Sequence, residues 1–206
     1  MTAEQLSETK GFRLSSFIER RAVPVGLTLM LGFLCYSSVS TFLALYTEDI
    51  GLTTAAGIFF VVYAVVIFFT RPLVGRRFDA QGENSVMYAA IVIFALGLVI
   101  LAVATRGSVL LLAAAFLGLG FGSLQACGRA VTVKVTPPHR MGQATSTFYT
   151  FCDIGLGLGP LLCGLLIPLT GYRGMYGIMA AITAASVVLY HLWHGRRAGR
   201  PAVQPF

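Results

Sequence analysis

The stretch NSVMYAAIVIFALGLVILAVAT, residues 84–105, decides the class of fold. It carries no formal charge and is long enough to cross a bilayer as one helix, which takes about 20 apolar residues. Five other stretches share this character, and a single acidic residue, Asp153, interrupts one of them. The six predicted spans cover residues 22–47, 53–70, 85–105, 108–135, 141–170 and 173–192. We therefore expect an all-α membrane protein with six transmembrane helices.

The composition of the chain leaves little room for a soluble domain. Hydrophobic residues make up 56% of the chain and charged residues 11%, whereas a soluble domain carries about 25% charged residues. We expect a cytoplasmic linker or interfacial segment over residues 1–21, a transmembrane domain over residues 22–193 and a basic cytoplasmic tail over residues 194–206.

Positive charges are distributed unevenly between the two sides of the predicted spans. Twelve of the 15 Lys and Arg residues fall on one side, two (Arg106 and Arg173) fall on the other, and Arg129 lies within a span. Short loops rich in Lys and Arg stay in the cytoplasm. We therefore expect an integral plasma (inner) membrane protein with both termini cytoplasmic. The net charge of +7 is divided among separate segments, so it does not indicate nucleic acid binding.

The sequence shows no pattern typical of a metal site, a cofactor or an enzyme. The four cysteines lie in apolar spans and lack the spacing of metal ligands. Ser123 follows a glycine pattern faintly similar to that of a membrane serine protease, but the three histidines lie at predicted loops or helix ends. A Ser–His pair at mid-membrane depth is therefore not expected.

The sharpest local motif is RPLVGRRFDAQG, residues 71–82. It resembles the G-x-x-x-D-x-x-G signature loop of the major facilitator superfamily (MFS), with Gly75, Asp79 and Gly82 at the three matching positions. The basic pair that usually follows the last glycine is absent from this chain.

The resemblance implies a gating loop over residues 71–84 at the cytoplasmic rim. We expect Gly75 to let neighbouring helices touch, and Asp79 to cap the following helix or to pair with an arginine. An ordinary charged loop is the alternative. The residues of this motif are Arg71, Gly75, Arg76, Arg77, Asp79 and Gly82.

Three later stretches resemble the C-terminal half of bacterial facilitator exporters. Residues 134–148, KVTPPHRMGQATSTF, are similar to the loop between helices ten and eleven, residues 153–160, DIGLGLGP, to helix eleven, and residues 171–176, GYRGMY, to the turn before helix twelve. The resemblance implies half of a facilitator, drug or metabolite exporter-like, with its six helices arranged as a 3+3 inverted repeat.

An internal glycine pattern is consistent with such a repeat. Gly82 follows Gly75 by seven positions, and Gly171 follows Gly164 by seven, each pair after a proline. If the two sets of three helices are inverted copies, these turns lie on opposite faces of the membrane. By the positive-inside rule, the cytoplasmic turn should then carry basic residues and the external turn should lack them, as is the case for residues 75–82 and 164–171.

Two ionisable residues lie inside predicted spans, and such residues suggest function because they are costly in hydrocarbon. Arg129 and Asp153 fall on consecutive antiparallel spans at depths that differ by about 7 Å, within reach of a long arginine. Asp153 is a candidate proton carrier or substrate residue. The alternatives are a fixed ion pair, a bond from Asp153 to Thr150 or Tyr149, and an Arg129 that reaches the interface.

Polar side chains in the first and fourth spans are candidates for lining a substrate path, because the resemblance places these spans beside it. Hydrogen bonding between helices is the alternative for each of them. Ser37, Ser40 and Thr41 have the spacing of one helical face. The candidates are Tyr36, Ser37, Ser40, Thr41, Ser123 and Gln125, with Arg129.

These observations together predict a transporter rather than an enzyme. The resemblance implies alternating access, with proton-coupled efflux of a small molecule through Asp153. It also implies that the chain needs a second six-helix half, supplied by a second copy or by a separate N-terminal half. A truncated or non-transporting remnant, an assembly partner and a channel are the alternatives. We expect no cofactor.

Overall fold

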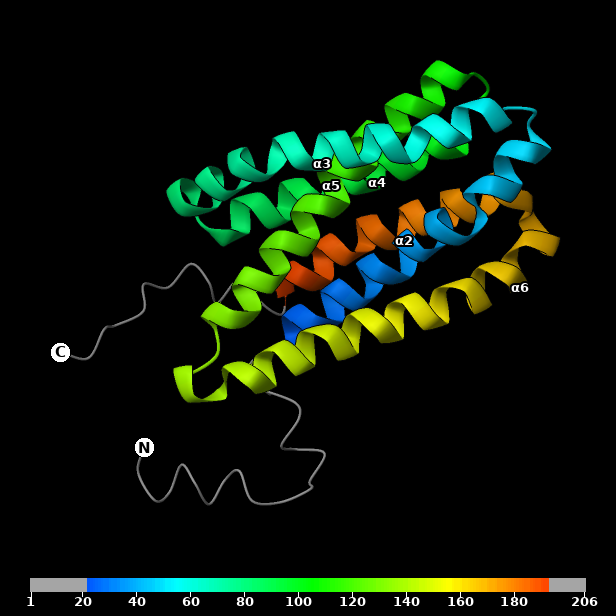
Figure 1. Ribbon diagram of the computed structural model, residues 1–206. Coiled ribbons are helices and arrows are strands. Elements are labelled where there is room, and N and C mark those ends of the chain that lie inside the picture. Colours follow the sequence, from blue (N-terminus) through cyan, green and yellow to red (C-terminus); the bar gives the residue numbers. More distant parts are fainter. Residues whose placement is uncertain (1–21, 193–206) are drawn as a thin grey trace.

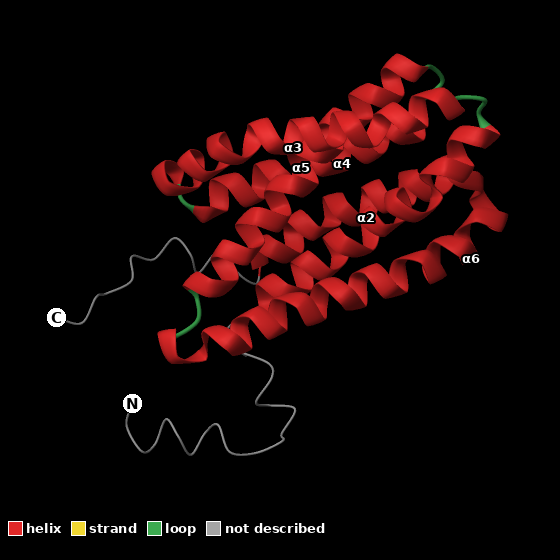
Figure 2. Ribbon diagram, in the orientation of Figure 1, coloured by secondary structure: helices red, strands yellow, loops and turns green. Residues whose placement is uncertain are grey.

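A computed structural model describes residues 22–192 of the chain, which are helical throughout apart from short turns (Figures 1 and 2). Five helices are long and apolar enough to cross a membrane. The predicted segments 1–21 and 194–206 lie outside the described residues. The elements are α2 (Val23–Asp49), α3 (Thr53–Gln81), α4 (Glu83–Ala102), α5 (Gly107–Lys134), the short 3-10 helix η2 (Pro138–Arg140) and α6 (Met141–Tyr190).

The last element, α6, contains the fifth and sixth predicted spans. It has 50 residues and a non-helical conformation at Gly171, with φ 68° and ψ 176°. The chain reverses direction near this glycine, so that the two limbs of α6 run side by side (Figure 1). The five helical elements do not by themselves confirm the six expected spans, because the bend at Gly171 divides α6 between the fifth and the sixth of them.

The prediction of a loop over residues 71–84 is wrong. Helix α3 continues to Gln81, and only Gly82 separates it from α4. Pro72 removes one backbone hydrogen bond, but Leu, Arg, Ala and Gln among the residues that follow have high helix propensity. The helix ends at Gly82, whose φ of 82° is outside the range of a right-handed helix. The arginines mark where the apolar span ends and not where the helix ends.

The helices pack in two groups that are joined through α4. Helix α2 packs mainly on α6, whereas α3 and α4 pack mainly on α5, and α4 also contacts α6. Glycine allows the closest approaches. A Cβ atom on Gly155 of α6 would meet the carbonyl oxygen of Met30, and one on Gly120 of α5 would meet the backbone of Phe94. Small residues at such crossings bring membrane helices into backbone contact.

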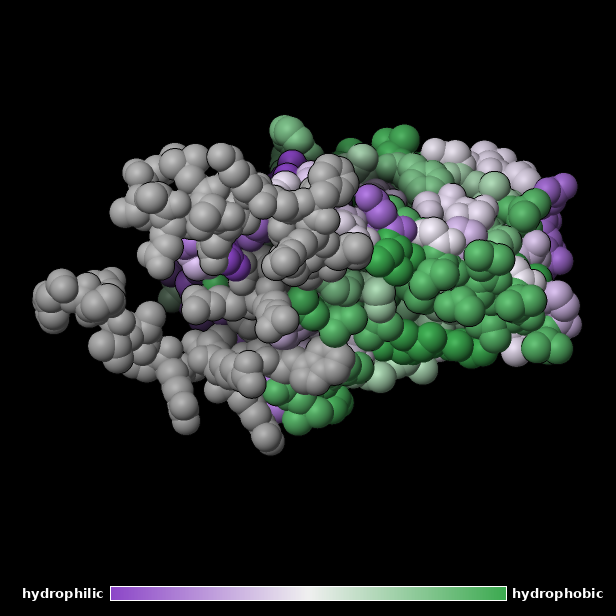
Figure 3. Space-filling model, turned by 90° about the horizontal axis from the view of Figure 1, so that it is seen from below, coloured by the Kyte–Doolittle hydropathy of each residue, from purple (hydrophilic) through white to green (hydrophobic). Residues whose placement is uncertain are grey.

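Two segments expose most of their apolar surface. Phe59 is the one buried residue of α3, and Phe68 is 74% exposed. The first limb of α6 ends with Leu165 and Leu169, the second of which is 81% exposed. Figure 3 shows a broad hydrophobic area on one face, with a hydrophilic rim at one end. Surface of this extent and polarity is suited to lipid or to another protein.

Candidate functional site

Arg129 lies on α5 and points at aromatic rings of α6. Its guanidinium carbon is 5.4 Å from the ring centroid of Phe148 and 5.2 Å from that of Tyr149. It also donates a hydrogen bond to the hydroxyl of Tyr149. A guanidinium above an aromatic face gains from the ring's negative charge distribution. These contacts hold the arginine in a defined position although its side chain is exposed.

The ion pair between Arg129 and Asp153, one of the alternatives that the sequence left open, is not formed among the described residues. Within residues 22–192, the one ion pair joins Glu83 and Lys134. The arginine bonds instead to Tyr149, which lies one turn before Asp153 on α6, about 6 Å away along the helix axis. The Tyr149 hydroxyl accepts the hydrogen bond that the Asp153 carboxylate would accept in such an ion pair.

Asp153 is exposed on the first limb of α6. The predicted alternatives, bonds to Thr150 or Tyr149, are not formed among the described side chains. Gly157 and Gly164 follow on the same face of the helix, and a Cβ atom at either would meet no described atom within 4 Å. Asp153 therefore lies on an exposed face of α6, where contact with lipid hydrocarbon would be unfavourable for a carboxylate.

A cavity of about 180 Å³ opens beside Arg129, between α5 and the start of α6. The hydroxyls of Thr132 and Thr145 line it, and they donate to carbonyls of their own helices, at 2.8 Å to Gly128 and 3.1 Å to Met141. The cavity is smaller than the roughly 300–1,000 Å³ of a typical pocket for a drug-sized ligand. It offers a guanidinium and hydroxyl oxygens to a small polar or anionic group, and on its own it encloses only part of a larger ligand.

The polar residues of α2 divide between two environments. Ser37 is buried, donates to the carbonyl of Leu34 at 2.7 Å and packs against Gly159 of α6. Its burial against α6 favours a packing role over the lining of a path, which were the two alternatives for this residue. Ser40 and Thr41 are exposed, and the Ser40 hydroxyl donates to the carbonyl of Ser37 at 3.2 Å. A shared spacing places residues near one another on a helix but does not fix which of them meets the neighbouring helix.

Tyr36 belongs to an aromatic stack that sequence reasoning missed. Its ring lies 4.0 Å from that of Phe121 on α5, nearly parallel, and 5.9 Å from that of Tyr63 on α3. Gln125 is partly buried one turn after Phe121 and one turn before Arg129, on the same side of α5. The stack, Gln125 and Arg129 thus form a strip along α5. The aromatic residues carried no motif that marked them.

A sequence profile of the Major Facilitator Superfamily matches residues 25–205. The chain belongs to this superfamily. An uncharacterized MFS-type transporter of Burkholderia mallei (strain SAVP1) is 29% identical over 178 residues, which are 86% of this chain and 44% of the relative. Another, from Pseudomonas aeruginosa (strain UCBPP-PA14), is 26% identical over 181 residues, 88% of this chain and 44% of the relative. The chain thus spans less than half the length of these relatives.

The superfamily is one of membrane transporters and not of enzymes, in agreement with the apolar helices of the chain. Residues 71–82 lie within the matched range. The structure places the motif on the last turns of α3, with Arg71, Gly75, Arg76, Arg77 and Asp79 all exposed.

Two expected roles within the facilitator motif are contradicted. A Cβ atom on Gly75 would meet no described atom within 4 Å, so this glycine brings no helices of residues 22–192 together. Asp79 does not cap α4, whose N-cap is Gly82 with no side-chain hydrogen bond. Nor does Asp79 form an ion pair with any described residue. Because a single residue separates α3 from α4, no loop exists that could bring the Asp79 carboxylate to the first turn of α4.

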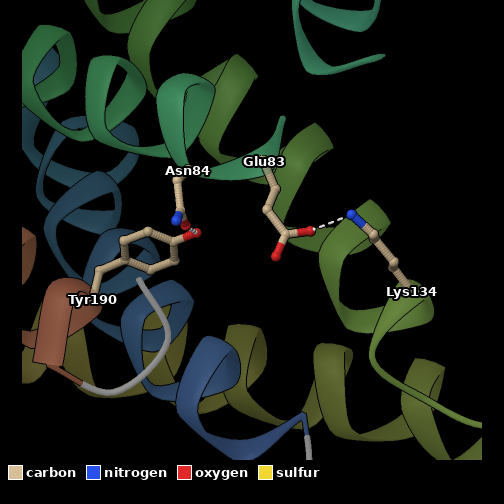
Figure 4. Close-up of polar contacts among 4 residues, drawn as sticks. All are labelled: Glu83, Asn84, Lys134 and Tyr190. Carbon is tan, nitrogen blue, oxygen red and sulfur yellow. Dashed lines mark hydrogen bonds and ion pairs between the residues drawn. The ribbon is translucent and has the colours of Figure 1, made fainter. Parts of the chain in front are cut away.

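The polar contacts at this end of the facilitator domain come from the start of α4 instead (Figure 4). Glu83 Oε2 lies 2.9 Å from Lys134 Nζ at the end of α5. The Tyr190 hydroxyl at the end of α6 donates to Asn84 Oδ1 at 2.9 Å. An acidic residue in a first turn and a lysine in a last turn also suit the two helix dipoles. The contacts tie three helix ends together.

Proposed function

We propose that the chain is one half of a facilitator transporter that moves a small molecule by alternating access between two halves. The observation that carries the proposal is the incompleteness of its site. The strip on α5 runs from the buried Phe121 to the exposed Arg129, the small cavity lies beside that arginine, and Asp153 is exposed. A second half facing them would enclose a path with polar groups at its centre.

Six membrane crossings in a 3+3 inverted repeat form the first part of the proposal. The fold of α6 at Gly171 supports six crossings. The packing supports the repeat, since α2 contacts the first limb of α6 at Gly155 and the second limb at Tyr176, and α5 packs on both α3 and α4. The turns at Gly82 and Gly171 lie at opposite ends of the bundle, as inverted copies require (Figure 1).

The second half is the next part of the proposal. The exposed faces of α3 and of the first limb of α6 supply apolar surface for it, and Gly75 and Gly164 on them leave room for close approach. Since 178 residues of this chain correspond to 44% of the Burkholderia relative, two copies of a 206-residue chain would approach the length of that protein. A homodimer or a separate N-terminal half would serve equally.

Proton-coupled efflux is the finer part of the proposal. Asp153, once ionised, would compete with the Tyr149 hydroxyl for the guanidinium of Arg129, and protonation would release it. That exchange couples a proton to the position of a cation beside the cavity. The export direction and an amphiphilic substrate rest on the resemblance to bacterial exporters. The distribution of Lys and Arg supports an inner membrane protein with cytoplasmic termini.

The coupling can be tested in proteoliposomes that contain the purified chain and an entrapped pH dye. We expect added ethidium, a lipophilic cation, to drive proton movement with the unchanged chain and with the control Asp49→Asn, an exposed acid at the end of α2. Asp153→Asn should abolish it while the unfolding temperature stays the same. Proton movement that survives Asp153→Asn contradicts the coupling. An assembled protein that moves neither ethidium nor protons favours a non-transporting remnant.

A further inference from the structure

A groove lined by residues of α3, α4 and α5 is separate from the cavity beside Arg129. It has a volume of about 120 Å³. Arg77, Gln81 and Ser85 line its polar end, where α3 turns into α4. Val74, Ala89 and Ile93 are among the apolar side chains that line the rest.

The polar end of the groove is cationic and has no acidic partner in the part of the chain that the structure describes. Within residues 22–192, no carboxylate lies within 4.0 Å of the Arg77 guanidinium, and Glu83 pairs with Lys134. Asp79 comes two residues after Arg77, which places it about 200° away around α3. The Ser85 hydroxyl donates to Gln81 Oε1 at 3.3 Å. An adjoining hollow, lined by Arg71, shares Val74 with the groove. The groove therefore presents positive charge that no carboxylate of residues 22–192 pairs with.

The apolar part of the groove has the depth of a lipid leaflet. Ser85 and Ile93 are eight residues apart on α4, which corresponds to about 12 Å along a helix. One leaflet of the hydrocarbon core is about 15 Å thick. The groove thus runs from the membrane surface into the acyl region, with polarity changing along it as in an amphiphile.

We propose that this groove binds an anionic phospholipid. The phosphate lies against Arg77, Gln81 and Ser85, and an acyl chain follows Val74, Ala89 and Ile93. A guanidinium matches the geometry of phosphate oxygens with two parallel hydrogen bonds. Basic pockets between membrane helices select anionic head groups in this way. A zwitterionic lipid brings an ammonium group as well, for which the groove has no carboxylate. The proposal does not depend on transport.

The test is native mass spectrometry of the purified chain, titrated separately with dioleoylphosphatidylglycerol and dioleoylphosphatidylcholine. We expect bound phosphatidylglycerol and little phosphatidylcholine. Arg77→Gln should weaken phosphatidylglycerol binding about fivefold. Arg76→Gln removes the same charge one residue away, outside the groove, and should leave binding unchanged. Ala89→Phe fills the groove without altering charge and should abolish retention. Circular dichroism checks that each variant keeps its helix content.

Three results would overturn the proposal. Equal loss in Arg76→Gln and Arg77→Gln would mean that only net charge matters. Equal retention of the two lipids would mean that the groove does not read the head group. Unchanged phosphatidylglycerol binding in Ala89→Phe would mean that the lipid binds elsewhere. The same conclusion holds if that variant keeps the lipid but loses a protein partner.

Discussion

Gly82 and Gly171 adopt the same unusual backbone conformation at the two ends of the bundle. The angles φ and ψ are 82° and 167° at Gly82 and 68° and 176° at Gly171. Each glycine is the seventh residue after an exposed glycine, Gly75 or Gly164, and each reverses the chain between two helical segments. Two turns far apart in the sequence thus have the same glycine backbone conformation, as the proposed inverted repeat requires.

Alanine at either turn glycine should destabilise the chain. This region of φ and ψ is essentially restricted to glycine, and an L side chain there costs about 1–3 kcal/mol. We expect Gly82→Ala and Gly171→Ala to lower the free energy of unfolding by that amount in detergent, measured by circular dichroism during denaturation. Gly164→Ala is the control, because it lies within a helix beside open space. Equal effects at Gly164 and Gly171 would contradict the account of the turn.

Close packing between α2 and α6 predicts a sharp contrast between two neighbouring glycines. A Cβ atom on Gly155 would strike the carbonyl of Met30, whereas one on Gly157 would meet no described atom within 4 Å. Gly155→Ala should therefore destabilise the chain by about 1–3 kcal/mol, as overpacking does. Gly157→Ala should be neutral or slightly stabilising in the same denaturation assay. Tolerance of Gly155→Ala would show that the two helices are not in backbone contact.

The ion pair at the end of the bundle should make a modest, salt-dependent contribution. Glu83 is buried, but the Lys134 side chain is 63% exposed, so solvent weakens the attraction. A double-mutant cycle with Glu83→Gln and Lys134→Gln should give a coupling energy of about 0.5–1 kcal/mol at low salt. The coupling should fall in 1 M salt. A value that is zero at low salt would show that the pair does not join α4 to α5.

The proposed role of Arg129 predicts different losses for two substitutions beside the cavity. Arg129→Lys keeps the charge but loses the planar fork that bonds Tyr149 and lies over two rings, so it should reduce ethidium-driven proton movement strongly. Tyr149→Phe keeps the ring and removes only the hydroxyl, so it should reduce that movement less. Initial rates in proteoliposomes provide the comparison, with unfolding temperatures as the check on folding. The reverse order of effects would contradict the assignment.

The sequence was sufficient to predict the helical membrane fold and the family. Charge-free stretches locate the helices because a charge in hydrocarbon is costly, and the glycine and aspartate spacing of residues 71–82 identified the superfamily. It was not sufficient to predict where α3 ends, although it placed the break between the fifth and sixth spans beside Gly171. Charges mark the membrane surface and not the helix ends. The backbone conformation of Gly82 ends α3, and that of Gly171 bends α6.

The contacts of the candidate site were predicted less well, for a physical reason. Depth along a helix follows from residue spacing, and it brought Arg129 near Asp153. The partner of Arg129 depends on how α5 and α6 are rotated against each other, and that rotation presents Tyr149. The same rotation buries Ser37 against Gly159. The packing of many side chains between the helices determines this rotation, so no single sequence motif predicts it.

The measurement that tests the central claim most directly is the mass and stoichiometry of the complex extracted gently from its native membrane. We predict a complex with two six-helix units, either two copies of this chain or one copy with a second chain of similar size. A stable complex that contains a single copy and no second unit would contradict the proposal, because no path between two halves would then exist.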